Sequence, residues 1–481
     1  MKTASLVLSA IMVLASFLVP TKGYALSSSS QAGQMEYVEV IDRDGKVLLF
    51  SRLIMGTDHL KQGGWVHLGQ TEQTDEEVFK VLDEAVRNGI NVIDTSPIYV
   101  GNIENLIGRY LESRREMIKR DDFYVDSRLN PDRKIYVITK GGFPYDLSYS
   151  RKLGAGYHSD EFLEALKEKG VEFSAIPNGE IELMNVPPGT YDSRLDGTVE
   201  DMIKAIKEEI QHSLQNLNGN PTVYLLHRDF FNSVGFKVIK ECRTCVEKIL
   251  TALSSHELTQ FYSMIGLSNW TTDRVKKAGE LASKNPKLFF PTFDSPYFSL
   301  FEMRKGVSIH ARGIQALHHE MMNPEYLKGV FMMPYSPLGG FSIFDKHVDP
   351  KKSWKMAKAD AKQKFDNGDA YWQNVYLAIF TPENEIRLNK AIEFLKNWNQ
   401  TYSTKYTLDQ LLNAYALAHQ RMNFLTMGPI TVDQVQRSIQ SLALSKQLNA
   451  NDLDFLHESD PKKLLELDHR FSRKNKCLKF Y

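Results

Sequence analysis

The chain has 481 residues, enough for two or three average domains or for one elaborated α/β barrel. Hydrophobic residues make up 42% of it and charged residues 25%, which is ordinary globular usage and sufficient for a large core. Lys plus Arg equals Asp plus Glu at 59 each, so the broad basic surface of a dedicated nucleic-acid-binding protein is not expected.

The first 25 residues form a signal-peptide pattern, in which Lys2 precedes an apolar run at 6–19 and small residues follow near Ala25. The run is shorter than the ~20 residues that a membrane span needs, and no later segment is long and apolar enough to span. We therefore expect export, with cleavage near Ala25 and an uncleaved anchor as the alternative. The final compartment, whether periplasmic, extracellular or organellar, is left open. A disordered serine-rich linker is expected at 26–36.

Residues 37–50 predict a small lid hairpin that turns at Asp44 and Gly45. After it, short β-rich runs alternate with helical patterns such as 75–88 and 199–217, which is typical of parallel strands with helical crossovers. The eight candidate strands are 53–55, 91–94, 135–139, 222–226, 263–266, 288–293, 329–333 and 423–426. Eight such units predict an α/β fold of the (β/α)8 TIM-barrel type.

Two segments are too long for ordinary barrel loops, 141–197 after the third strand and 341–404 after the seventh. We interpret them as insertions into a barrel that occupies 37–445 and is followed by a C-terminal tail at 446–481. Each insertion follows a strand, so each should rise from the C-terminal face of the barrel and contribute to a substrate pocket.

An acid, a phenol, a cation and an imidazole follow three neighbouring candidate strands. Asp94 ends the second strand, Tyr99 follows it, Lys140 ends the third and His227 ends the fourth. A phenol can donate a proton to a carbonyl oxygen, and a nearby ammonium group should lower its pKa from ~10. Asp94 would keep Lys140 charged, and His227 would orient the carbonyl. No metal is needed for this chemistry.

Six segments resemble the signature blocks of aldo-keto reductases and occur in that family's order. They are NVIDTSPIY at 91–99, ITKGG at 138–142, LHRD at 226–229, IGLSNW at 265–270, YSPLG at 335–339 and MGP at 427–429. The resemblance implies that Asp94, Tyr99, Lys140 and His227 form the family's catalytic tetrad. It also implies NAD(P)H-dependent reduction of an aldehyde or ketone to an alcohol. The cofactor-binding positions that it implies are Gly56, Thr57, Ser268, Asn269, Tyr297, Tyr335, Ser336, Leu338, Gly428 and Gln434.

Two positions depart from the family pattern. The glutamine that usually holds the nicotinamide carboxamide is absent, and the register leaves Asp294 or Tyr297 near its place. The loop at 429–431 lacks the Lys or Arg that many relatives offer to the 2′-phosphate of NADP. The family resemblance favours NADP(H), and the loop leaves NAD(H) open.

Two other classes of function fit the same barrel. The chain could be a regulatory or scaffolding protein that binds a nicotinamide cofactor with little turnover, or a barrel that binds a ligand without redox chemistry. Cys242 and Cys245 form a CxxC pair, but no second pair or nearby histidine pair completes a zinc site, so two thiols with no shared role are favoured. The substrate, the oligomeric state and the physiological direction do not follow from the sequence.

Overall fold

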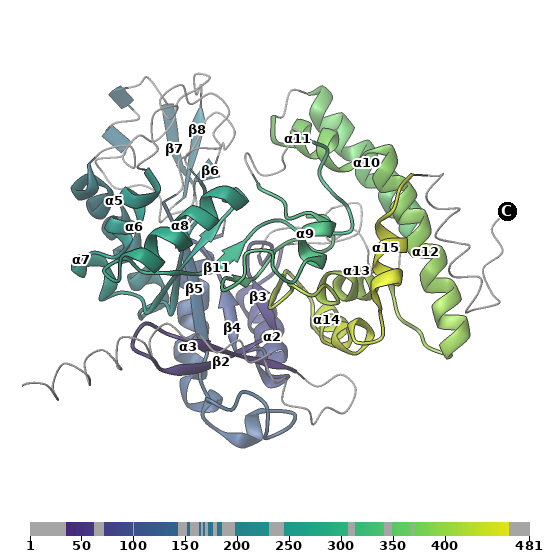
Figure 1. Cartoon of the computed structure of the whole chain (residues 1–481), viewed down its shortest axis with the longest axis horizontal. Helices are drawn as coiled ribbons and strands as arrows, with labels where there is room; N and C mark the ends of the chain where they lie inside the picture. The colour runs from purple at the N-terminus through teal and green to yellow at the C-terminus, as the bar shows by residue number, and fades with distance from the viewer. Residues whose placement is uncertain are drawn as a thin grey trace, which may run out of the picture.

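The structure is a computed structural model (Figure 1) that describes residues 35–61, 72–99, 101–142, 152–153, 163–164, 167–168, 172–176, 180–184, 198–229, 245–305, 313–340, 349–367 and 370–460. The expected signal peptide, most of the expected linker, Cys242 and residues 461–481 lie outside these ranges. In the described part of the chain, no helix is both long and apolar enough to cross a membrane.

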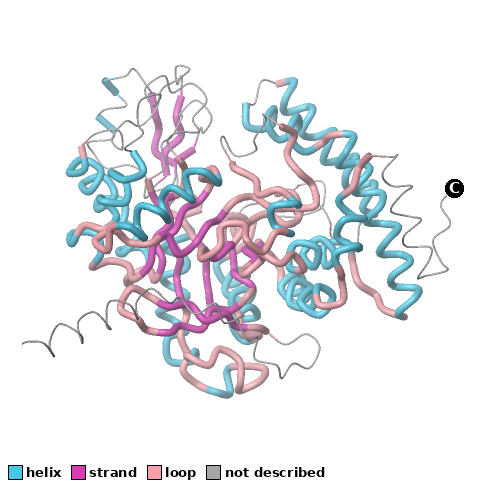
Figure 2. Tube along the Cα trace, viewed as in Figure 1, coloured by secondary structure: helices cyan, strands magenta, loops and turns pink. Residues whose placement is uncertain are grey.

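Eight parallel strands form the centre of the molecule (Figure 2). In the order of their pairing they are β12 (Phe331–Met332), β11 (Pro291–Ser295), β10 (Met264–Ser268), β9 (Val223–Leu226), β5 (Tyr136–Gly141), β4 (Val92–Asp94), β3 (Leu53–Gly56) and β13 (Leu425–Met427). Two backbone hydrogen bonds join the outermost strands, from Phe424 to Met332 and from Thr426 to Pro334, both 2.9 Å long. The sheet therefore closes on itself, and the predicted (β/α)8 barrel is confirmed.

The barrel interior is filled by inward-facing apolar residues and closed at one end by the N-terminal hairpin. This hairpin consists of β1 (Tyr37–Ile41) and β2 (Val47–Ser51), with a turn at Gly45 whose φ is +80°. Phe50 is fully buried and packs against Tyr136 and Phe293, with ring centroids 4.7 and 6.0 Å away. Tyr136 begins β5, so the hairpin covers the end where the strands begin. The site described below lies at the opposite end.

Helices surround the barrel. They include α2 (Asp75–Arg87), α3 (Ile103–Ile118), α5 (Val199–Leu217), α6 (Cys245–Leu253), α8 (Thr272–Lys284), α13 (Leu408–Leu417) and α14 (Val432–Ser445). Most are amphipathic, as the periodicity predicted, whereas α13 is buried along its whole length. Capping boxes begin α2 at Thr74 and α5 at Thr198. The face of α2 that carries Val78, Leu82 and Ala85 is buried against the barrel.

The two long segments after β5 and β12 contain secondary structure of their own (Figure 1). In the first, β6 (Lys152–Leu153), β8 (Glu180–Met184) and β7 (Glu172–Ile176) pair in that order as an antiparallel sheet. In the second, α10 (Pro350–Asp366), α11 (Ala370–Ile379) and α12 (Pro382–Tyr402) extend to the other side of the molecule. After α14, the described residues 446–460 contain the helix α15 (Ala450–His457), which packs against α12.

Candidate active site

Asp94, Lys140 and Tyr99 meet where β4 and β5 end. The Lys140 ammonium donates hydrogen bonds to Asp94 Oδ1 at 2.5 Å, to the Tyr99 hydroxyl at 2.8 Å and to the Thr95 carbonyl at 3.0 Å. The side chains of Lys140 and Asp94 are 5% and 4% exposed. One buried cation therefore bridges a carboxylate and a phenol.

His227 reaches the same point from the end of β9, the next strand of the sheet. Its ring lies edge-on to the Tyr99 ring, with centroids 6.2 Å apart. Its Nδ1 lies 3.3 Å from the hydroxyl of Ser96. The structure thus brings together all four residues that the sequence placed at successive strand ends.

The electrostatics of Tyr99 differ from the prediction. Burial raises the pKa of Tyr99 well above its usual range, and the charges of Asp94 and Asp58 raise it further, while Arg228 lowers it. We expected Lys140 to lower this pKa. Asp94 lies 2.5 Å from the ammonium and neutralises much of its field, although burial also raises the pKa of Asp94 itself. The phenol of Tyr99 therefore carries its proton at neutral pH, as a proton donor must.

The residues matched to the nicotinamide site form a connected network beside His227. Asn269 donates through Nδ2 to the Ser268 hydroxyl at 2.9 Å and to the His227 carbonyl at 3.3 Å. Its Oδ1 accepts a hydrogen bond of 2.6 Å from the Tyr335 hydroxyl. Asn269 has a φ of +60°, a conformation that asparagine tolerates better than most residues. The network holds Tyr335 at the mouth of the barrel.

The sequence suggested Asp294 or Tyr297 as a partner of the nicotinamide carboxamide in place of the missing glutamine. In the structure, the Tyr297 hydroxyl is bonded within the protein and Asp294 points away from the tetrad. Tyr297 is 1% exposed, and its hydroxyl donates to the Phe301 carbonyl at 2.5 Å. Asp294 is buried, its pKa is raised to about 8 by burial, and the charge of Glu320 adds to the shift. Phe293, the preceding residue, faces the barrel interior, so Asp294 points outward, away from the tetrad.

Four further matched positions lie at or just after the ends of β3 and β12. A Cβ on Gly56 would lie 2.9 Å from the Met427 carbonyl oxygen, so this glycine allows β3 and β13 to approach. Thr57 donates through its hydroxyl to the Asp94 carbonyl at 2.9 Å. Ser336, with a φ of +59°, and Leu338 lie in the turn after β12.

The loop after β13 is ordered by the first turn of α14. Gln434 accepts through Oε1 a hydrogen bond of 2.8 Å from the Ile430 backbone, and Thr431 caps the helix through a 3.2 Å bond from Gln434 N–H. A Cβ on Gly428 would lie 3.3 Å from the His59 ring. Of the two matched residues here, Gln434 therefore orders the loop, and Gly428 allows the His59 ring to approach closely.

The structure also shows two charged residues that the sequence analysis did not select, Asp58 and Arg228. Both act on the pKa of Tyr99 and on that of Tyr335, Arg228 by lowering and Asp58 by raising it. Arg228 is 6% exposed and directly follows His227. The sequence offered one indication of its role, which is its position in the LHRD segment.

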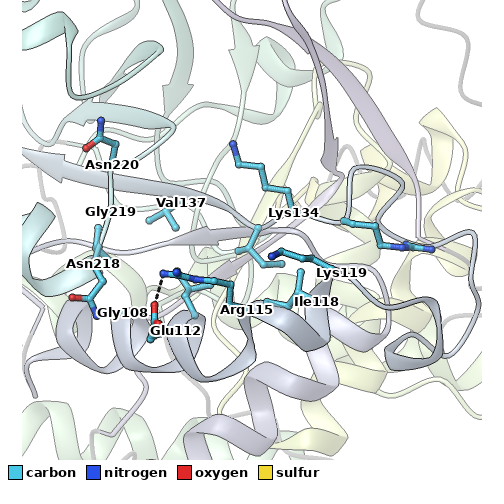
Figure 3. A pocket seen from close by; sticks show the side chains of 14 residues that line it. Gly108, Glu112, Arg115, Ile118, Lys119, Lys134, Val137, Asn218, Gly219 and Asn220 are labelled. Carbon is cyan, nitrogen blue, oxygen red and sulfur yellow. Dashed lines mark hydrogen bonds and ion pairs between the residues drawn. The ribbon is translucent and has the colours of Figure 1, made fainter.

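A pocket at the other end of the barrel is not part of this site (Figure 3). Its lining includes Ile118 and Lys119 at the end of α3, Lys134 before β5 and Asn218 after α5. All of these lie near the beginnings of strands.

Among the described residues, no group of three or more His, Cys, Asp or Glu side chains is arranged to hold a metal ion.

A comparison with known protein families identifies the family of this chain. The sequence model of the aldo/keto reductase family matches residues 52–169 and 194–460, and the gap between the two stretches falls in the segment after β5. Among solved structures, a glycerol dehydrogenase from Gluconobacter oxydans is similar at 14% identity and a TM-score of 0.47, over 92% of this chain and 97% of the other. No curated protein sequence matches the chain significantly. The family match covers most of the chain, which therefore belongs to the aldo/keto reductase family.

Proposed function

We propose that the protein is an oxidoreductase that reduces an aldehyde or ketone to an alcohol with NAD(P)H, and that Tyr99 is its general acid. The observation that carries the proposal is the position of the Lys140 ammonium, which hydrogen-bonds both Asp94 and the Tyr99 hydroxyl in a buried site. This arrangement holds a protonated phenol at the end of the barrel where enzymes of this fold perform chemistry.

The roles of the residues follow from their contacts. Tyr99 holds the proton that the carbonyl oxygen receives, and Lys140 stabilises the phenolate that remains. His227, fixed by Ser96, orients the carbonyl. The nicotinamide cofactor would supply the hydride. Ser268, Asn269 and Tyr335 form a polar network of suitable chemistry to hold its ring beside Tyr99.

We propose NADP(H) as the cofactor, because the family resemblance favours it, with NAD(H) also accepted. The loop at 428–431 carries no cation that could pair with a 2′-phosphate. The nearest basic residue along α14, Arg437, is 5% exposed and is held by Asp409 at 2.7 Å and by Asp433. Discrimination between the two cofactors should therefore be weak.

The test is oxidation of NADPH and NADH by the purified protein across a panel of aldehydes, ketones and quinones, beside a Tyr99→Phe variant. We expect turnover to fall by about 10²–10⁴ in the variant, the usual contribution of a general acid, with cofactor affinity nearly unchanged. Undiminished turnover would contradict the assignment of Tyr99. Cofactor binding without reduction of any carbonyl would favour the regulatory function instead.

We also propose that the protein is exported, on the basis of Lys2 and the apolar run at 6–19. Intact-mass measurement on the native protein tests this proposal. A mature chain that begins after Ala25 is expected, and a chain that retains residues 1–25 in the cytoplasm would contradict it.

A further inference from the structure

Two buried glutamates lie behind Lys140, on the outer side of the barrel wall. Glu104 comes from α3 and Glu209 from α5, and they are 2% and 4% exposed. Successive side chains of a strand point to opposite faces, so Thr139 and Gly141 face these helices while Lys140 faces the barrel mouth. The two carboxyl groups therefore approach β5 from the side opposite the candidate active site.

Each carboxyl group holds a residue that flanks Lys140. The Thr139 hydroxyl donates to Glu104 Oε1 at 2.5 Å, and the Gly142 N–H donates to Glu209 Oε2 at 2.6 Å. Between them, the Gly141 carbonyl accepts a 2.8 Å hydrogen bond from the backbone of His227. The end of β5 is thus fastened to α3, to α5 and to the strand that carries His227.

Gly141 shows how closely this wall is packed. A Cβ at this position would lie 2.0 Å from the Tyr224 hydroxyl oxygen and 2.5 Å from Glu209 Oε2. Only glycine allows the two polar groups to reach the backbone next to Lys140. Any shift of Glu209 or Tyr224 would therefore be transmitted to the end of β5.

Charge links Glu104 to Lys140 as well. Burial raises the pKa of Glu104 to about 7, against the opposing effects of its hydrogen bonds and of the Lys140 charge. The ionisable groups that face it are Lys140 on β5 and Tyr224 on β9, and Tyr224 in turn faces Glu209. When Glu104 loses its proton, the added negative charge weakens the positive field that Lys140 presents to Tyr99.

We propose that Glu104 and Glu209 are positioning residues of the candidate active site, which hold Thr139 and Gly142 on either side of Lys140 and set the charge behind its ammonium group. This inference rests on the proposed reductase function. Neither glutamate touches the position of a substrate, so both act through Lys140.

Glu104→Gln and Thr139→Val separate the charge from the hydrogen bond. The amide oxygen of Glu104→Gln can still accept from Thr139, but the titrating charge is gone. In the unmodified enzyme, ionisation of Glu104 around neutral pH should lower kcat as the pH rises. Glu104→Gln should abolish this fall, so that kcat of the variant at pH 8 is about threefold above that of the unmodified enzyme. Thr139→Val should lower kcat by about tenfold through misplacement of Lys140. Because Glu104 also loses a hydrogen bond that lowers its pKa, the pH profile should keep its fall but move to higher pH.

Glu209→Ala and Glu209→Gln test the second contact. The alanine variant should lower kcat by about tenfold at unchanged cofactor KM, whereas the glutamine variant keeps an acceptor for Gly142 and should retain most of kcat. Asp452→Asn, at a buried carboxyl on α15, is the matched control and should leave the pH profile unaltered.

Amide hydrogen exchange of residues 136–142 gives a readout that needs no turnover. Exchange should be at least about tenfold faster in Glu209→Ala than in Glu209→Gln, because the Gly142 N–H loses its acceptor. Equal exchange in the two variants, or an unmodified pH profile in Glu104→Gln, would overturn the inference. Failure of the reductase proposal would appear separately, as unchanged turnover in Tyr99→Phe.

Discussion

Two clusters of ionisable side chains, one buried and one partly buried, differ in how the chain builds them. The first is the tetrad, Asp94, Tyr99, Lys140 and His227, at the ends of three adjacent barrel strands. The second, here called the histidine cluster, consists of His318, His419, His457, Glu302, Arg387 and Asp454. It joins α9 (His318–Met322) and the segment after α13 to α12 and α15.

The histidine cluster is a chain of ring contacts and hydrogen bonds. His318 Nδ1 lies 2.9 Å from His419 Nε2, and His318 Nε2 lies 2.9 Å from Asp454 Oδ1. The rings of His318 and His457 stack with centroids 4.3 Å apart. His457 also lies 2.8 Å from Glu302, so the cluster ties the last described helix to the body of the protein.

The two clusters place their charges differently. In the tetrad a cation lies between a carboxylate and a neutral phenol, so charge is stored next to a proton donor. In the histidine cluster, burial and the charge of His318 lower the pKa of His419 to about 3, and burial also lowers the pKa of His318. The first cluster suits proton transfer. In the second, His318 and His419 are kept neutral beside the Arg387–Glu302 ion pair, and acid should open the contact between the two histidines.

The largest effect is expected from Lys140→Met, which removes the cation of the tetrad. Asp94 would remain buried without its partner, so the free energy of unfolding should fall by about 3–5 kcal/mol and turnover by about 10²–10⁴. Urea unfolding and steady-state kinetics measure the two losses. Adding Asp94→Asn to Lys140→Met should recover much of the stability but no turnover. If the losses in free energy of unfolding of the two single variants simply add in the double variant, the pairing of Lys140 with Asp94 would be contradicted.

Acidification should weaken the histidine cluster next. An unfolded histidine has a pKa near 6.5, so the stability that neutral His419 contributes is complete above that pH and is lost as the pH falls below it. Between pH 6.5 and pH 5 the loss for this residue is about 2 kcal/mol. Urea unfolding at both pH values measures it. His419→Gln should reduce the pH dependence, while His256→Gln, at an exposed site on α7 (His256–Thr259), should not; equal pH dependence in all three proteins would refute the assignment.

A smaller effect concerns the cofactor loop. Val432 is exposed in the first turn of α14, and Val432→Arg would place a cation beside residues 428–431. We expect the KM for NADPH to fall by about tenfold with little change for NADH, because a charge-assisted hydrogen bond contributes about 1.5–3 kcal/mol at best. Val432→Gln is the uncharged control. Equal changes in the KM values of NADPH and NADH would contradict a 2′-phosphate site beside residues 428–431.

The smallest effect is expected far from both clusters, at the capping box of α2. Thr74→Ala removes the acceptor for the Glu77 N–H and should lower the free energy of unfolding by about 1 kcal/mol. kcat should stay within experimental error. A loss of turnover larger than the loss of stability would show that α2 is coupled to the site.

Strand ends explain why the tetrad could be predicted. Asp94 and Lys140 occur at the ends of short apolar runs, and parallel strands bring such ends together at one face of the sheet. Lys140 and Tyr99 therefore followed from local pattern and topology. The direction of the Tyr99 pKa did not, because it depends on burial and on the 2.5 Å contact between Lys140 and Asp94.

The sequence alone determined the barrel, its eight strands and the four residues at the mouth, since these depend on periodicity and on chain order. Tertiary structure decided that Tyr297 bonds inward to Phe301, that the N-terminal hairpin closes the end opposite the site, and that His318 meets His419 and His457. It also placed Glu104 and Glu209 behind Lys140. Such contacts join residues from different helices, strands and loops, and no local pattern specifies which buried polar groups will lie together.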